Sequence, residues 1–185
     1  MKLYNILENG SGLLRSISLD CQEFLEESND IPLIKWCSPE WPDVHRIKVR
    51  KKKHSDKFTE QFNSAFSDIY PSLLNRSIII NKSKPDTINE KFYIFPVDGF
   101  KFIHCSKIIN SREQLSPTLN EIMEGMGSDL APEIIQEMLQ VTYQESNLNE
   151  AIMDDGEIII YNIPVFYAVK SNMNYKNLLE ILKND

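Results

Sequence analysis

Short runs of β-branched and aromatic residues recur along the chain and are separated by segments of helical periodicity. Two of these runs, FYIFPV at 92–97 and FKFIHC at 100–105, flank Asp98-Gly99, a dipeptide that is typical of tight hairpin turns. The other expected strands are at 31–37, 77–81, 157–162 and 165–170. Hairpins and mixed segments of this kind predict an α+β fold with a largely antiparallel sheet.

Helices are expected where apolar residues recur every three or four positions. A stripe of aromatic residues predicts a helix that begins at an N-cap, Ser55, and ends at Tyr70-Pro71. The other expected helices are at 13–27, 116–127, 131–143, 147–152 and 175–183. Because the chain shows no internal repeat and no low-complexity linker, we expect a single domain over residues 1–185.

The composition is that of an ordered globular protein. Of the 185 residues, 42% are hydrophobic and 25% are charged, and no apolar run approaches the roughly 20 residues that a membrane helix needs. The first residues do not resemble a secretory signal. The three cysteines, Cys21, Cys37 and Cys105, are widely spaced and indicate free thiols in a reducing compartment. We therefore expect a cytoplasmic protein with no membrane partner and no structural metal site.

Positive charge is concentrated in one segment of an acidic chain. Residues 45–57 carry seven Lys or Arg side chains against Asp56, a net charge of +6 within a total of −7. Such a segment indicates an anionic partner, which could be a phosphate, a nucleotide, a nucleic acid or an acidic protein surface. The alternative is a solvated edge strand whose lysines prevent pairing with another chain. Nucleic acid is the less favoured partner because the chain is acidic overall and its aromatic residues are not interleaved with these cations.

Generic catalytic motifs are absent from the sequence. There is no P-loop, GxGxxG, HExxH or GxSxG pattern, and the six glycines are too few for a glycine-rich phosphate loop. Asp154, Asp155 and Glu157 form an acidic cluster that could bind Mg²⁺, although a solvated turn with Gly156 at positive φ is favoured. His104, beside Cys105, has no defined third partner and is interpreted as a packed or edge residue.

Five segments resemble, in order, a group of bacteriophage proteins with an ADP-ribosyltransferase-like fold. The segments are PLIKW at 32–36, RKKKHSDKF at 50–58, NRSIII at 75–80, FYIFPVDGFKF at 92–102 and GEIIIYNIPVFYAV at 156–169. The resemblance implies a split, mostly antiparallel sheet within a single α+β domain. The helical segment at about 106–152 lies outside the resemblance and would be an insert.

The resemblance also implies a function and a site. The protein would be a mono-ADP-ribosyltransferase that uses NAD as co-substrate to modify a host macromolecule, which supplies the nucleophile. Glu157 would be the catalytic carboxylate that stabilises an oxocarbenium-like transition state. Lys35 and Arg50 would bind the NAD phosphates, and Ser77 would contact the nicotinamide ribose. Lys35 stands where the family has an arginine, and Trp36 follows it where the family has a small residue.

These substitutions keep a second interpretation open. A lysine lacks the bidentate fork with which an arginine binds phosphate, and a bulky Trp36 could fill the NAD site. The protein would then be a catalytically degenerate member of the group, acting as a phage structural or host-interaction protein. Its partner would be a host or phage protein that meets the basic segment.

Overall fold

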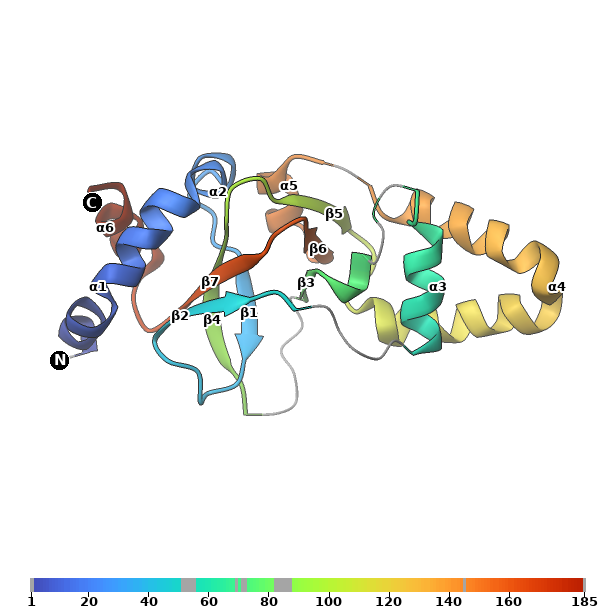
Figure 1. The fold of residues 1–185 in the computed structure, drawn as a ribbon, viewed down its shortest axis with the longest axis horizontal. Coiled ribbons are helices and arrows are strands. Elements are labelled where there is room, and N and C mark those ends of the chain that lie inside the picture. Colours follow the sequence, from blue (N-terminus) through green and yellow to red (C-terminus); the bar gives the residue numbers. More distant parts are fainter. Residues whose placement is uncertain are drawn as a thin grey trace.

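The computed structural model describes residues 2–50, 56–68, 70, 73–81, 88–144 and 146–184, without the side chains of residues 2–10 and 127–129. Two antiparallel sheets form its centre (Figure 1). The first has the strand order β1-β4-β7-β2, with bounds Ile34–Cys37, Glu90–Pro96, Val165–Lys170 and Val44–Lys48. The second has the order β3-β6-β5, with bounds Ile78–Ile80, Glu157–Tyr161 and Lys101–Cys105. The predicted α+β class and antiparallel pairing are confirmed.

The predicted hairpin across Asp98-Gly99 is wrong, because β4 and β5 belong to different sheets. β4 pairs with β1 and β7, whereas β5 pairs with β6. Gly99 does adopt the left-handed conformation of a turn, with φ of 79°. The turn is held by the N-terminal helices, since the backbone N–H of Asp98 donates to the Asp20 carbonyl at 2.7 Å and that of Gly99 donates to the Glu23 carboxylate at 2.6 Å.

The two sheets share a bent pair of strands. The chain leaves β4 for β5 at Gly99 and leaves β6 for β7 at Asn162, whose φ is 62°. The Asn162 side chain donates to the Gly99 carbonyl at 2.9 Å, so the two bends lie side by side. One long antiparallel ribbon therefore runs through both sheets and changes direction at this point.

The N- and C-terminal helices cover the four-stranded sheet. These are α1 (Lys2–Asp20), α2 (Gln22–Glu27) and α6 (Tyr175–Asn184). Their apolar residues share one core with that sheet, including Leu14, Ile17, Phe24, Leu178 and Leu182. The helix predicted at 13–27 is thus present, but it begins earlier and is interrupted at Cys21. All three cysteines are buried and free, as predicted.

The three-stranded sheet packs against α3 (Lys57–Ala65) and α4 (Ser111–Thr142), which form a second core (Figure 1). Asp56 is the N-cap of α3 and accepts the N–H of Thr59 at 2.9 Å, whereas the predicted cap, Ser55, lies outside the described residues. Arg112 at the start of α4 pairs with Asp56, and this bond holds the pKa of the Asp56 carboxyl at about 2.

α4 differs from the two helices predicted at 116–127 and 131–143. It is one helix of 32 residues that contains Pro117 and Pro132. Figure 1 shows that it turns back on itself, so that its two arms project beyond α3. Leu119 and Leu139, one from each arm, lie in the same core cluster. A proline removes a helical hydrogen bond and clashes with the preceding turn, so the prolines within α4 favour a bend.

Two shorter helices complete the described fold. The 3-10 helix η1 (Leu73–Asn75) follows α3, and α5 (Leu148–Met153) joins α4 to β6. Within the part of the chain that the structure describes, we find no helix with the length and apolar character needed to cross a membrane.

Candidate functional site

Glu157 lies at the first position of β6 and is fully buried. Its Oε1 atom accepts the hydroxyl of Tyr143 at 2.8 Å, and its Oε2 atom accepts the backbone N–H of Ser111 at 3.1 Å. Burial raises the pKa of Glu157, against the opposing effects of Ser111, Tyr143 and the Lys35 charge. The carboxylate thus connects β6 to both ends of α4.

Gly156 precedes this carboxylate and packs against the end of β5. A Cβ atom on Gly156 would overlap the carbonyl oxygen of Cys105 and lie 2.7 Å from the Cα of Ser106. Positive φ was the expected reason for this glycine, and that prediction is wrong: among the described glycines the positive φ is at Gly99. Close backbone approach is the reason for glycine here.

Lys35 connects the two sheets. Its Nζ atom donates to the carbonyl of Ile79 on β3, while its own strand, β1, belongs to the other sheet. Ile79 pairs with Ile159 on β6, the strand that begins with Glu157, and the Lys35 charge opposes the rise in the pKa of Glu157. Trp36 points to the opposite face, as successive strand residues do, and Lys91 lies over its ring at 5.3 Å. Trp36 therefore does not fill the space beside Lys35.

Ser77 and Arg50 occupy different surroundings. Ser77 directly precedes β3, and its hydroxyl is buried without a hydrogen-bond partner among the described residues. Arg50 is exposed and lies two residues beyond β2. β1 and β2 form opposite edges of their sheet, so Lys35 and Arg50 come from opposite edges. The structure thus brings Lys35 and Glu157 together and leaves Arg50 at the surface.

The described part of the basic segment is an edge strand with an exposed row of cations. Arg46, Lys48 and Arg50 are exposed, whereas His45, Ile47 and Val49 between them are half-buried. Strand β2 is an edge strand of its sheet, and among the described strands it pairs with β7 alone. This is the edge-strand alternative considered above. The lysines at 51–53 lie outside the described residues.

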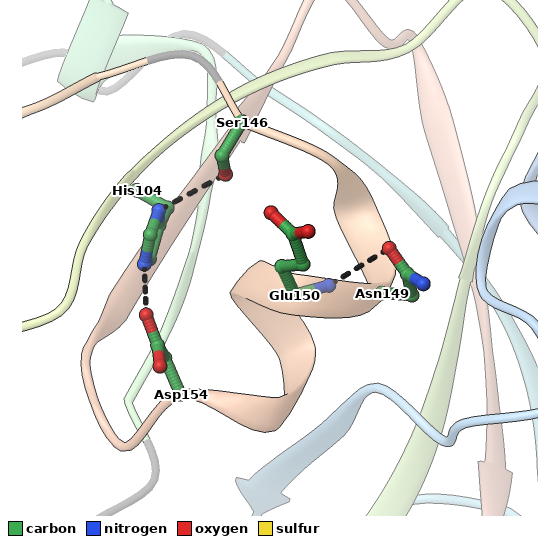
Figure 2. Close-up of polar contacts among 5 residues, drawn as sticks. All are labelled: His104, Ser146, Asn149, Glu150 and Asp154. Atoms are coloured by element: carbon green, nitrogen blue, oxygen red, sulfur yellow. Dashed lines mark hydrogen bonds and ion pairs between the residues drawn. The ribbon is translucent and has the colours of Figure 1, made fainter.

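His104 has partners that the sequence did not reveal. Its Nε2 atom lies 2.9 Å from Oδ2 of Asp154, and its Nδ1 atom lies 3.1 Å from Oγ of Ser146 (Figure 2). We call these three residues the His104 cluster. His104 is a largely buried residue of an edge strand, as interpreted, but it has two side-chain partners that were not expected. Its partners are 42 and 50 residues away in sequence and follow no known motif, so no sequence signal could have found them.

Backbone contacts hold the His104 cluster in place. His104 and Gln144 exchange two backbone hydrogen bonds, each 3.0 Å long, which lays the segment before Ser146 along β5. Asp154 follows α5, and its N–H donates to the Glu150 carbonyl at 3.0 Å. The His104 side chain is 12% exposed and that of Asp154 is 48% exposed. Within the described ranges, no group of three or more acidic, histidine or cysteine side chains is placed to hold a metal ion.

A cavity of about 650 Å³ borders this cluster. Its lining combines aromatic, amide and charged residues: Glu23, Glu27, Phe100, Lys101, Phe102, Ser146, Asn147, Leu148, Asn149 and Tyr161. Ser146 therefore contributes to the wall of a cavity large enough for a small molecule.

Comparison with known proteins identifies no relative. No protein-family model, no curated protein and no solved structure matches this chain.

Proposed function

We propose that the protein acts by binding an acidic partner protein, of phage or host origin, and that Glu157 serves the fold instead of transferase chemistry. The observation that carries this proposal is the burial of Glu157, with each carboxylate oxygen bonded to a neighbour within the fold. A carboxylate that stabilises an oxocarbenium ion has to contact the ribose. The carboxylate of Glu157 instead contacts Tyr143 and Ser111.

The exposed row on β2 is the binding surface of this proposal. Arg46, Lys48 and Arg50 occupy alternate positions, about 6.6 Å apart at ~3.3 Å per residue. Guanidinium groups pair with carboxylates in a bidentate geometry, which favours acidic side chains as the partner groups. Aromatic residues for base stacking are not interleaved with these cations, so an acidic protein surface fits better than nucleic acid.

Charge reversal tests the surface. We expect a variant carrying Arg46→Glu, Lys48→Glu and Arg50→Glu to bind poly-L-glutamate at least about tenfold more weakly than the parent, because each substitution replaces attraction with repulsion. Fluorescence anisotropy at low and physiological salt measures this affinity. The parent's binding should weaken with salt.

The matched control reverses the same number of charges elsewhere, at the exposed residues Arg76, Lys107 and Lys176. It should bind poly-L-glutamate like the parent. Equal loss in both variants would mean that only net charge matters and would refute a specific surface. Tighter binding of single-stranded DNA than of poly-L-glutamate would show that the partner is a nucleic acid.

Transfer of ADP-ribose from NAD is the second candidate function, and the proximity of Lys35 to Glu157 favours it. In this case Glu157 must leave Tyr143 and Ser111 when NAD enters. The Lys35 ammonium would bind a phosphate, and Ser77, whose buried hydroxyl lacks a partner among the described residues, would contact the ribose.

Thermal unfolding with NAD separates the two candidates. A transferase should be stabilised by about 1.4 kcal/mol at tenfold Kd, which raises Tm by roughly 3–6 °C for a chain of this length. Lys35→Ala should remove that rise, and Glu157→Gln should abolish transfer of labelled ADP-ribose to host lysate. For the binding function proposed first, we expect no change in Tm with millimolar NAD.

A further inference from the structure

We propose that Ser146, His104 and Asp154 form a nucleophilic site that hydrolyses short carboxylic esters, with Ser146 as nucleophile, His104 as general base and Asp154 as the residue that positions His104. This activity is separate from the proposed binding function and does not rest on it. The site lies at the wall of the 650 Å³ cavity, whose lining includes neither Glu157 nor the basic row on β2.

The hydrogen bonds of the cluster fix the direction of proton transfer. A carboxylate can only accept, so His104 donates its Nε2 proton to Asp154 across 2.9 Å. A neutral imidazole then has its other nitrogen, Nδ1, as acceptor, and the Ser146 hydroxyl must donate to it across 3.1 Å. This distance is within the range of a serine activated by an adjacent base. Figure 2 shows the three side chains in this order.

The surrounding structure holds His104 in position and leaves Ser146 accessible. Two backbone hydrogen bonds to Gln144 fix the backbone of His104, and the His104 side chain is largely buried. Ser146 is half-buried and faces the cavity. A base screened from water beside an accessible nucleophile is the arrangement that nucleophilic catalysis requires.

The cavity supplies polar groups for the substrate. Asn147 and Asn149 are among its lining residues, and an amide N–H donor can stabilise the oxyanion of a tetrahedral intermediate. Glu23 and Glu27 also line it, opposed by Lys101. This acidic environment favours neutral or cationic esters over anionic ones.

The reaction proceeds in two balanced steps. The Ser146 oxygen bonds to the acyl carbon as its proton passes to His104, and the ester C–O bond breaks as that proton passes to the leaving alcohol. Water then attacks the acyl-serine, gives its proton to His104, and releases the carboxylic acid when Ser146 recovers its proton. No metal or redox partner is needed.

An active-site-directed fluorophosphonate tests the nucleophile. The parent should form one adduct, in which the Ser146 oxygen displaces fluoride, and mass spectrometry of peptides locates it. Ser146→Ala should form none, whereas Ser106→Ala, a matched control at an exposed serine near the end of β5, should react like the parent. The absence of an adduct in the parent, or an adduct that survives Ser146→Ala, would overturn the proposal.

Ester turnover tests the roles of the other two residues. The parent should hydrolyse p-nitrophenyl acetate and acetylthiocholine, and it should act poorly on a succinate monoester. Asp154→Asn should lower kcat at least about a hundredfold with KM little changed, because the base loses its orientation. If Asp154→Asn keeps the parent's kcat, or lowers Tm without a separate loss of kcat in the folded fraction, Asp154 is only a structural partner of His104 and the proposed site is refuted.

Discussion

Replacing Gly156 with alanine should destabilise the protein by more than about 3 kcal/mol. The added Cβ atom would meet the carbonyl oxygen of Cys105 and the Cα of Ser106, and these are backbone atoms that cannot turn aside like a side chain. β5 would have to separate from the start of β6. Because Cys105 pairs with Glu157, the displacement would also disturb the buried carboxylate and the bonds that it accepts.

Urea unfolding measures the loss, and Tm should fall by at least about 6 °C for a chain of this length. Gly125→Ala is the matched control: a Cβ atom there meets nothing within 4 Å, and Gly125 lies within α4. Alanine stabilises an exposed helix relative to glycine by about 0.5–1 kcal/mol, so this variant should equal or exceed the parent. If Gly156→Ala unfolds with the parent's midpoint, the close approach of β5 and Gly156 is wrong.

Replacing Glu157 with alanine should cost about 3 kcal/mol or more. The Tyr143 hydroxyl and the Ser111 N–H would lose their acceptor inside the protein, at about 1–3 kcal/mol for each buried group left unsatisfied. The cavity left by the missing side chain lowers the stability further. Glu157→Gln keeps the size and one acceptor oxygen, so it should be far milder. Equal stability of Glu157→Ala and the parent would show that Glu157 has no structural role.

The same carboxylate predicts a pH dependence with a defined sign. Burial raises the pKa of Glu157 above its usual value of 4.5, so the folded state favours the neutral carboxyl. Its stabilising contribution is complete below pH 4.5 and is lost as pH rises through the raised pKa. Glu157→Gln should therefore gain stability relative to the parent as pH rises above 4.5. A difference in unfolding free energy that stays constant over that range would contradict this prediction.

Strand positions could be predicted from local pattern, whereas sheet membership could not. The apolar runs at 92–97 and 100–105 became β4 and β5, within two residues of the expected bounds. Their pairing depends on contacts that the Asp98 and Gly99 backbone makes with α1 and α2, which lie about 75 residues earlier. β2 was expected only as the edge-strand alternative for the basic segment, because its exposed cations conceal the half-buried Ile47.

The bend in α4 shows a similar limit. Pro117 and Pro132 indicated the start of two separate helices, because proline suits a first helical turn. The structure has one assigned helix through both positions, but it turns back on itself (Figure 1), and its two arms share the core of Leu119 and Leu139. The prolines alone did not distinguish two separate helices from one bent helix.

The fold class and the candidate site depend on different kinds of information. The sequence by itself determined the α+β class, the antiparallel strands and the basic segment, because residue periodicity and charge are local properties. Only the tertiary structure decided that Glu157 is enclosed by Ser111 and Tyr143, and that His104 meets Ser146 and Asp154. The physical reason is that burial and side-chain hydrogen bonds arise between segments distant in sequence, and only their packing determines which polar groups meet.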